Sequence, residues 1–299
     1  MTASQGTGTG DQGPDRATLA VFALLVVIGG SNAVAVRFSN LELPPFWGAG
    51  ARFAAAAFVF WFVALARRTP VPRGRTLVQI LVFGLISVGS SYALLYWGLL
   101  RVSAGLTMTV LAFVPLLTFF LAILQRQEEF RKRGLLGALI SLAGILIAVG
   151  SRLDGGLHIP SVLAVAAAAG FIAEGNVFFK TIPRTDPVVT NAVATTGGAV
   201  FLLVVSRITG EAWSIPAGSD TWTAYLYLVL IGTVGLFYLY LFVLGRWTAS
   251  ATSYAFLLFP VSTVVLAALI EGETITAEFL TGLALVIVGV WIGVFRRES

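Results

Sequence analysis

Ionisable side chains are rare inside the long apolar stretches of this sequence, and the first candidate for chemistry is Glu174. It lies in GFIAEGNVFF and is the only carboxylate well inside such a stretch. A charge near the centre of a bilayer costs at least about 2.5 kcal/mol, so intramembrane carboxylates face a cavity or a partner, or stay protonated. Glu174 is therefore a candidate for proton coupling or for the counter-ion of a cationic substrate. A protonated carboxyl bonded to a neighbouring helix is the structural alternative.

Arg52, in GARFAAAAF, is the matching basic residue. It either extends its apolar stem toward the outer headgroups, which is the interpretation we prefer from sequence, or binds an anionic group. A pair with Glu174 is disfavoured. By residue count, Arg52 lies in the outer part of its apolar stretch and Glu174 in the inner part of another.

Two amides, Asn32 in GGSN and Asn176 in EGN, are candidate substrate contacts. A side-chain amide also joins membrane helices, and both interpretations stay open. Glu174 and Asn176 are two residues apart, about 200° around a helix, so they cannot both point directly at one cavity. Which of them faces the cavity is therefore undecided by sequence.

Four tyrosines combine an aromatic ring with a polar end: Tyr92, Tyr96, Tyr238 and Tyr254. Tyr92 and Tyr96 are four residues apart and share one face of a helix. We predict an aromatic and polar pocket for an organic solute from these residues. The alternative is a position at the membrane interface, where tyrosine is common.

Pro115 and Pro260 lie near the middle of apolar stretches and are the candidate hinges. Each lacks an N–H and obstructs the carbonyl four residues earlier, at Leu111 and Phe256. Those carbonyls need another partner or face a cavity, although a simple packing kink is the alternative. Thr107, on the same stretch as Pro115, either lines a polar path or bonds a backbone carbonyl.

The residue inventory argues against an enzyme. There is no cysteine and only one histidine, so thiolate metal sites, thiol nucleophiles and histidine-based triads are not expected. The aspartates all lie outside the apolar stretches, and GTGTGDQG lacks the GK[ST] ending of a phosphate-binding loop. We expect no cofactor, no metal and no nucleic-acid partner.

The elements that must position these residues are membrane helices. The chain is 58% hydrophobic and 11% charged, with a mean hydropathy of +0.92. Continuous apolar stretches of about 20 residues predict helices, since the period-two pattern of barrel strands is absent. Residues 1–16 are polar and expected to be a disordered tail. We predict ten spans: 17–36, 46–66, 77–98, 103–124, 134–151, 160–180, 187–206, 222–244, 249–270 and 277–295.

Basic residues predict the orientation of these spans. With the N-terminus inside, fourteen of the nineteen Lys and Arg residues fall on the inner side and four on the outer side, with Arg52 within a span. This asymmetry predicts a multi-pass inner-membrane protein with both termini in the cytoplasm.

The chain also contains an internal repeat. Residues 101–125 and 246–270 match when shifted by 145 positions, including Arg101 with Arg246 and Pro115 with Pro260. Glycines at 137 and 144 match those at 282 and 289. Each copy holds five predicted spans, and an odd number places the second copy upside down in the membrane, as in many secondary transporters.

The order and spacing of these motifs resemble the EamA modules of the drug/metabolite transporter superfamily. The resemblance rests on GGSNAVAVRFSN and LPPFWGAGARF, on YWGLLRVSAGLTMTVLAFVPLLTFFLA, and on its second copy through LLFPVSTVVLAALIEGETIT. It implies an all-α integral membrane protein with ten transmembrane helices in two inverted repeats, residues 17–153 and 160–297. It also implies a central cavity lined mainly by spans 1, 3, 4, 6, 8 and 9. The Gly-Glu pair that the family has after span nine is present at 272–273 but is replaced after span four.

The function expected from this resemblance is secondary active or facilitative transport of a small metabolite, amino acid or drug by alternating access, with export favoured. Asn32, Tyr92, Tyr96, Thr107 and Asn176 are then cavity residues, together with Tyr238 and Tyr254. Coupling to protons and homo-oligomer formation are left open. A lipid-handling flippase or a membrane scaffold subunit is the alternative, and its mark would be a laterally open groove or a required partner.

Overall fold

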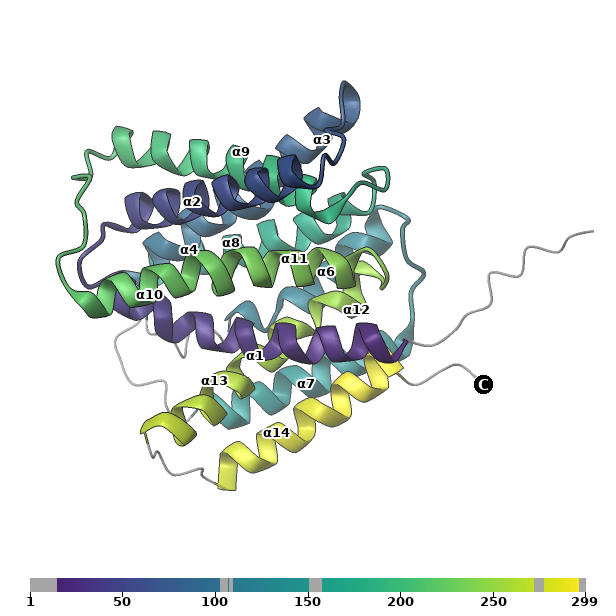
Figure 1. The fold of residues 1–299 in the computed structure, drawn as a ribbon. Coiled ribbons are helices and arrows are strands. Elements are labelled where there is room, and N and C mark those ends of the chain that lie inside the picture. Colours follow the sequence, from purple (N-terminus) through teal and green to yellow (C-terminus); the bar gives the residue numbers. More distant parts are fainter. Residues whose placement is uncertain (1–14, 103–106, 108–109, 151–157, 272–276, 296–299) are drawn as a thin grey trace, which may run out of the picture.

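The protein is a bundle of helices in a computed structural model that describes residues 15–102, 107, 110–150, 158–271 and 277–295. This part of the chain contains no strand. Its long uninterrupted helices are α1 (Arg16–Ser39), α2 (Pro45–Ala66), α7 (Lys132–Gly150), α8 (Ile159–Phe179), α9 (Pro187–Ile208) and α14 (Ala277–Val290). The beginning of α1 and the end of α14 lie at the same end of the bundle (Figure 1).

Five helical stretches are long and apolar enough to cross a membrane: Pro45–Ala66, Arg75–Leu99, Ile159–Phe179, Pro187–Ile208 and Ser219–Leu244. Shorter apolar helices occupy Arg16–Asn32, Val114–Leu124 and Leu280–Gly293. The outer faces carry large apolar side chains that are strongly exposed, such as Phe58 and Phe62 on α2. A surface of this kind suits a protein surrounded by lipid rather than water.

Two of the long stretches change helix type at corresponding places. The stretch Arg75–Leu99 comprises α3 (Arg75–Gly84), the π-helical segment η1 (Leu85–Ser90) and α4 (Ser91–Leu99). The stretch Ser219–Leu244 comprises α10 (Ser219–Val229), the π-helical segment η2 (Leu230–Gly235) and α11 (Leu236–Leu244). The shift of 145 residues superposes η1 on η2, so the repeat extends to local backbone geometry. Single π-helical turns are frequent at functional sites.

The two proline-containing stretches are both interrupted, but at different places. In the first, the helix breaks at Ala112 and Phe113, and α6 (Val114–Leu124) restarts with Pro115 in its first turn, where the missing N–H costs nothing. In the second, α12 (Ala249–Ser253) ends at Tyr254, and α13 (Ala255–Glu271) carries Pro260 inside it. The predicted hinge is therefore a helix start in one copy and an interior proline in the other.

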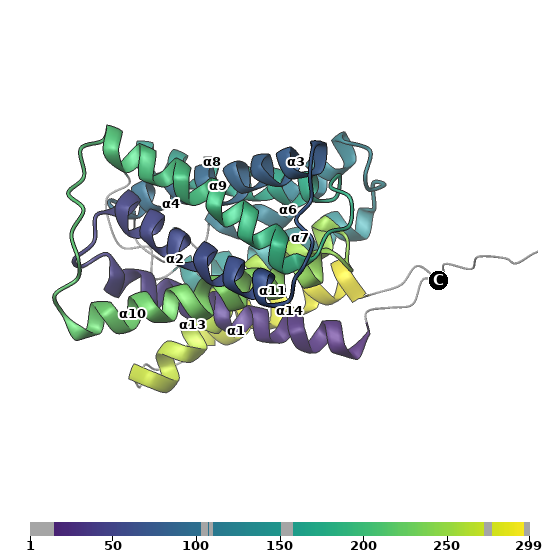
Figure 2. The ribbon, with the colours of Figure 1, turned by 45° about the horizontal axis from the view of Figure 1, so that its top comes forward.

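Helix pairing follows a two-fold pattern. Helix α2 packs along α9, α7 packs along α14, α1 lies against α13 as α6 lies against α8, and α4 contacts α8 as α11 contacts α1. Figure 2 shows α3 and α9 along the top of the view and α1 along the bottom. Every one of these pairs maps onto itself or onto another pair when the two copies exchange.

Glycines at the α7–α14 crossing show the same relationship at atomic scale. A Cβ atom on Gly137 would lie 2.6 Å from the Gly289 carbonyl oxygen, and one on Gly144 would lie 2.6 Å from the Gly282 carbonyl oxygen. Under the shift, Gly137 corresponds to Gly282 and Gly144 to Gly289. The contacts are thus reciprocal, as a two-fold axis between two similar halves requires.

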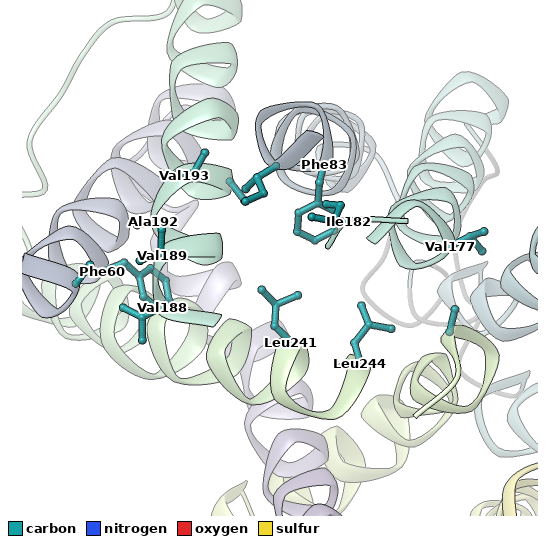
Figure 3. Close-up of a cluster of buried hydrophobic side chains, with 14 of the residues drawn as sticks. Phe60, Phe83, Val177, Ile182, Val188, Val189, Ala192, Val193, Leu241 and Leu244 are labelled. Atoms are coloured by element: carbon teal, nitrogen blue, oxygen red, sulfur yellow. The ribbon is translucent and has the colours of Figure 1, made fainter. Parts of the chain in front are cut away.

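One end of the bundle is closed by a buried apolar cluster. Its members come from α2, α3, α6, α8, α9, α11, α12 and the segment after α8, and they include Phe60, Phe83, Ile182, Leu241 and Leu244. Figure 3 shows Leu241 and Leu244 extending from α11 toward Phe83 and Ile182. This is the end at which α2 finishes and α3 begins.

Candidate solute-binding cavity

A cavity of about 620 Å³ lies between the helices, within the range usual for small-molecule sites. Its lining comes from α1, α2, the two stretches that contain η1 and η2, α8, α9 and α13, together with Val102, Thr107 and Leu111. Most of the lining is apolar or aromatic. The polar members are Asn32, Asn40, Arg52, Ser87, Tyr92, Tyr96, Thr107, Asn176, Asn191 and Tyr240.

Several of these polar groups have hydrogen-bonding atoms that the protein leaves free. Nine buried side-chain atoms have no hydrogen-bond partner among the described residues. Six of them belong to the lining: Asn32 Oδ1, Asn40 Oδ1, Ser87 Oγ, Thr107 Oγ1, Asn176 Nδ2 and Asn191 Nδ2. Buried polar atoms in native proteins are nearly always bonded to protein, water or ligand. Their concentration around one cavity indicates that a polar ligand or ordered water completes them.

Arg52 is the charged residue of this lining, and the structure corrects the sequence interpretation of it. We expected its side chain to extend to the outer headgroups, but it is only 1% exposed. Its Nε donates to Thr233 Oγ1 at 2.7 Å and its Nη2 donates to the Gly232 carbonyl at 2.9 Å. The side chain turns inward because η2 supplies a hydroxyl and a carbonyl as hydrogen-bond acceptors for the guanidinium.

Tyr96 and Tyr92 complete the surroundings of this guanidinium, and both line the cavity. Arg52 Nη1 donates to Tyr96 Oη at 3.2 Å, and the guanidinium carbon lies 6.0 Å from the centre of the Tyr92 ring. Tyr92 packs edge-on against Phe53, with the ring centres 4.7 Å apart. Asn32, another predicted cavity residue, donates from Nδ2 to the same Gly232 carbonyl at 2.9 Å.

The repeat places equivalent positions of the two halves on the cavity wall. Four pairs of lining residues are related by the 145-residue shift: Tyr92 with Phe237, Leu95 with Tyr240, Tyr96 with Leu241, and Leu111 with Phe256. In three of these pairs one member is a tyrosine and the other is apolar. The halves therefore share a shape but differ in polarity, and the resulting cavity is asymmetric.

The structure decides which face of α8 meets the cavity. Asn176 lines it and accepts a hydrogen bond of 2.8 Å from Tyr240 Oη. Glu174 lies outside the lining, and its Oε2 accepts a hydrogen bond of 2.8 Å from Gln125 Nε2 beyond the end of α6. The predicted role of Glu174 as a counter-ion in contact with the solute does not fit this placement.

Two predicted cavity tyrosines lie elsewhere. Tyr238 packs against the apolar cluster at the closed end. Tyr254 is buried between α7 and α14 and donates to the Gly134 carbonyl at 2.9 Å. The sequence contained a signal against Tyr238, because the shift maps Tyr92 onto Phe237 and therefore places Tyr238 on a different helix face.

The remaining predicted residues fall near the cavity. Thr107 lines it and is 1% exposed. Pro115 and Pro260 are not part of the lining, but Leu111 and Phe256, the residues four positions before them, both are. Both positions four residues before the prolines thus lie at the cavity, and the role of the prolines as hinges stays a prediction.

Sequence reasoning missed Asn40, Ser87, Asn191 and Tyr240 as lining residues. Asn191 is an amide within the predicted seventh span, a signal of the same kind that identified Asn32 and Asn176. Ser87 lies in η1, and no pattern in the sequence predicts a π-helical turn there. Helices α2 and α9 also contribute to the lining, although the family resemblance implied mainly other spans.

The cavity reaches toward one end of the bundle and is closed at the other. Asn40, Leu41, Leu99 and Val102, at the ends of α1 and α4, are part of the lining, and Leu41 is 75% exposed. The opposite end holds the apolar cluster of Figure 3.

Polar contacts reinforce the closed end. Lys180 Nζ donates to the carbonyls of Leu244 and Trp247, and burial lowers the pKa of Lys180, opposed by the nearby Glu128 carboxylate. Glu128 Oε1 accepts from the Ser250 N–H at 3.1 Å, where α12 begins. The end of α8 is thereby joined to the segment after α11, and the segment after α6 is joined to the start of α12.

A bundle of long apolar helices around one partly polar, aromatic cavity defines a multi-pass membrane transport protein. Residues 17–150 and 159–295 each match the EamA-like transporter family, and the chain belongs to that family. The family consists of transporters, so this protein is a transporter and not an enzyme.

Similar proteins extend over most of the chain. A probable amino-acid metabolite efflux pump of Salmonella typhimurium is 28% identical over 284 residues, covering 91% of this chain and 93% of the relative. The uncharacterized inner membrane transporter YedA of Escherichia coli is 29% identical over 261 residues, covering 86% and 83%. A solved crystal structure superposes with a TM-score of 0.80 at 20% identity, over 93% of this chain and 98% of that one, which shows a shared fold.

Proposed function

We propose that the protein exports a small organic metabolite across the inner membrane by alternating access. The observation that carries the proposal is the set of unpartnered buried polar atoms around one aromatic cavity between the two halves. A relative that is described as an amino-acid metabolite efflux pump supports the direction and the size class of the solute. The relative YedA supports the inner membrane.

We further infer ten transmembrane helices in two inverted five-helix repeats, residues 17–153 and 160–297, with both termini in the cytoplasm. The two family matches, the reciprocal glycine contacts and the superposed π-helical segments support the repeats. The excess of Lys and Arg on one side supports the orientation. With this orientation, the closed end faces the cytoplasm and the lining at Asn40 and Leu41 faces outward.

The binding residues in this proposal are Asn32, Tyr92, Tyr96, Thr107 and Asn176. Arg52, Asn191 and Tyr240 join them on the geometry of the cavity. An alternate state would open the apolar cluster around Phe83 and Leu241 and close the outer end, because two similar halves can exchange their conformations.

Transport by purified protein in sealed vesicles tests the proposal. Solutes from several charge classes are loaded inside, and efflux is compared with that of empty vesicles and of vesicles holding the Asn176→Ala/Asn191→Ala variant. Efflux of a solute above the empty-vesicle rate, reduced in the variant, supports the proposal. Scrambling of a fluorescent phospholipid without efflux of any solute would favour the flippase alternative.

A reversible cross-link tests alternating access separately. The chain has no cysteine, so the pair Phe83→Cys/Leu241→Cys is unique. A short, reducible, bifunctional reagent joining α3 to α11 should hold the closed end shut, stop efflux, and release it after reduction. The two single-cysteine variants, treated in the same way, are the controls. Undiminished efflux by the linked protein would place the moving elements elsewhere.

A further inference from the structure

We propose that the transported solute is an organic monocarboxylate with an apolar body, and that Arg52 binds its carboxylate. This inference rests on the proposed function and names the chemical class that the same cavity takes. It begins from the position of Arg52, a guanidinium that is 1% exposed on the wall of the cavity.

The positive charge of Arg52 has no anionic partner in the described part of the chain. Its three hydrogen bonds go to a threonine hydroxyl, a tyrosine hydroxyl and a backbone carbonyl, all of them neutral. A guanidinium has five donors, so one N–H on each terminal nitrogen is left over. Two terminal N–H groups suit the bidentate recognition of a carboxylate.

A structural role alone does not account for this residue. The contacts with Thr233 and Gly232 do join α2 to η2, but a neutral donor would make them without burying a charge. Buried charges in proteins are normally paired or coordinated. Helices α2 and α9 begin at Pro45 and Pro187, so Ala194 is the equivalent of Arg52. The cation therefore belongs to one half only and marks one end of an asymmetric site.

The rest of the lining restricts the solute further. The described lining residues include Arg52 but no aspartate or glutamate. Arg52 can therefore balance one negative charge on the solute, whereas an ammonium group on the solute would have no carboxylate to pair with. Most of the remaining wall is apolar, with rings from Tyr92, Phe237, Phe256 and Phe259. The cavity therefore favours a monoanion with an apolar body over a cation, a dianion or an amino-acid zwitterion.

A matched ligand series tests this charge preference on purified wild-type protein. The dissociation constants of 3-phenylpropanoate, 3-phenylpropanamide, 3-phenylpropylamine and phenylalanine are measured by titration calorimetry. The four share a ring and a chain and differ in charge. A second pair, 4-methylpentanoate and its amide, replaces the ring by a branched chain. We expect each acid to bind at least about tenfold more tightly than its amide, with the amine weakest, because charge-assisted hydrogen bonds are roughly twice as strong as neutral ones.

Variants assign the preference to Arg52. In Arg52→Gln the ratio of acid to amide affinity should fall to about one, whereas Arg52→Lys should keep part of it because the charge remains. Arg207→Gln is the matched control, because Arg207 lies over the Trp213 ring and away from the cavity. A thermal melt of every variant shows whether it is folded. The ligand series on wild-type protein tests the charge preference even if a variant does not fold.

The outcomes separate this inference from the proposed function. Equal binding of acids and amides by wild-type protein, tight binding of phenylalanine or the amine, or no binding of either acid would overturn the monocarboxylate proposal. Efflux of a neutral or cationic solute that Arg52→Gln leaves unchanged would also overturn it while sustaining transport. The acids could also bind in a way that depends on Arg52 without crossing the vesicle membrane. That result would support the carboxylate site and contradict the transport proposal.

Discussion

The hydroxyl of Tyr240 donates a 2.8 Å hydrogen bond to Oδ1 of Asn176, and this contact joins α11 to α8 at the cavity wall. It fixes the orientation of the amide and leaves Asn176 Nδ2 without a partner among the described residues. The two residues come from the same half of the repeat. The position equivalent to Tyr240 in the other half is Leu95, so this polar contact is made once.

Removing the hydroxyl should weaken solute binding more than stability. We expect Tyr240→Phe to raise the apparent KM for efflux several-fold, because the freed amide rotates, and to lower the unfolding free energy by about 1 kcal/mol. Tyr238→Phe is the control, since Tyr238 packs outside the lining. Efflux kinetics and thermal unfolding of both variants measure the two effects. A larger effect of Tyr238→Phe would mean that the cavity is misassigned.

Glu174 should be dispensable for binding. Because its carboxylate bonds Gln125 and not the cavity, we expect Glu174→Gln to change the dissociation constant of the solute by less than about twofold. Glu174 stays our proposal for proton coupling through the end of α6. Efflux with and without a pH gradient therefore accompanies the binding measurement. A tenfold loss of affinity in this variant would show that Glu174 reaches the solute.

The α7–α14 crossing should not tolerate a methyl group. A Cβ atom on Gly144 would meet backbone on the partner helix, the Gly282 carbonyl at 2.6 Å and the Val286 nitrogen at 2.9 Å. We expect Gly144→Ala to destabilise the protein by about 1–3 kcal/mol, as overpacking does. Gly170→Ala is the control, because a Cβ there meets nothing within 4 Å. Thermal unfolding in detergent compares the two variants. Equal melting temperatures would contradict the close packing of α7 against α14 at Gly144.

Acid should weaken the contact between Glu42 and the segment at the start of α10. The Thr221 hydroxyl and the N–H groups of Ala217 and Gly218 hold the pKa of Glu42 below its ordinary value of 4.5. A lowered folded-state pKa gives stability that is present above the unfolded value and is lost as pH falls through the folded value.

The melting temperature of wild type should therefore exceed that of Glu42→Gln at neutral pH, and the difference should shrink as pH falls to about 3. Glu129→Gln, at an exposed site, controls for the loss of one carboxylate. A difference between wild type and Glu42→Gln that grows in acid would reverse the sign of this argument.

Several features of the fold were predictable because they are written in local composition and periodicity. The apolar stretches predicted helices at 46–66 and 160–180, and the structure confirms both, at Pro45–Ala66 and Ile159–Phe179. The repeat predicted that Gly137 and Gly282 are equivalent, and their reciprocal contacts agree with it. The four-residue spacing of Tyr92 and Tyr96 correctly placed both on one face, because helical periodicity fixes angles along a single helix.

The cavity residues were harder to predict because a side chain's direction depends on its neighbours in space. Tyr254 has the composition of a binding residue but lies between α7 and α14. Asn191 and Tyr240 gave weak sequence signals, yet both reach the cavity. The π-helical segments η1 and η2 also rotate the residues that follow them, which an ideal helical wheel does not include.

By itself, then, the sequence determined an all-helical membrane chain with a duplicated segment, since hydrophobicity and repetition are properties of the chain alone. Only the tertiary structure decided in which direction its two intramembrane charged side chains point. Arg52 turns inward because η2, far away in sequence, supplies Thr233 and Gly232 as partners. Glu174 turns from the cavity because Gln125 meets it at the end of α6. A charged side chain in apolar surroundings orients toward polar partners, and tertiary packing determines where those partners lie.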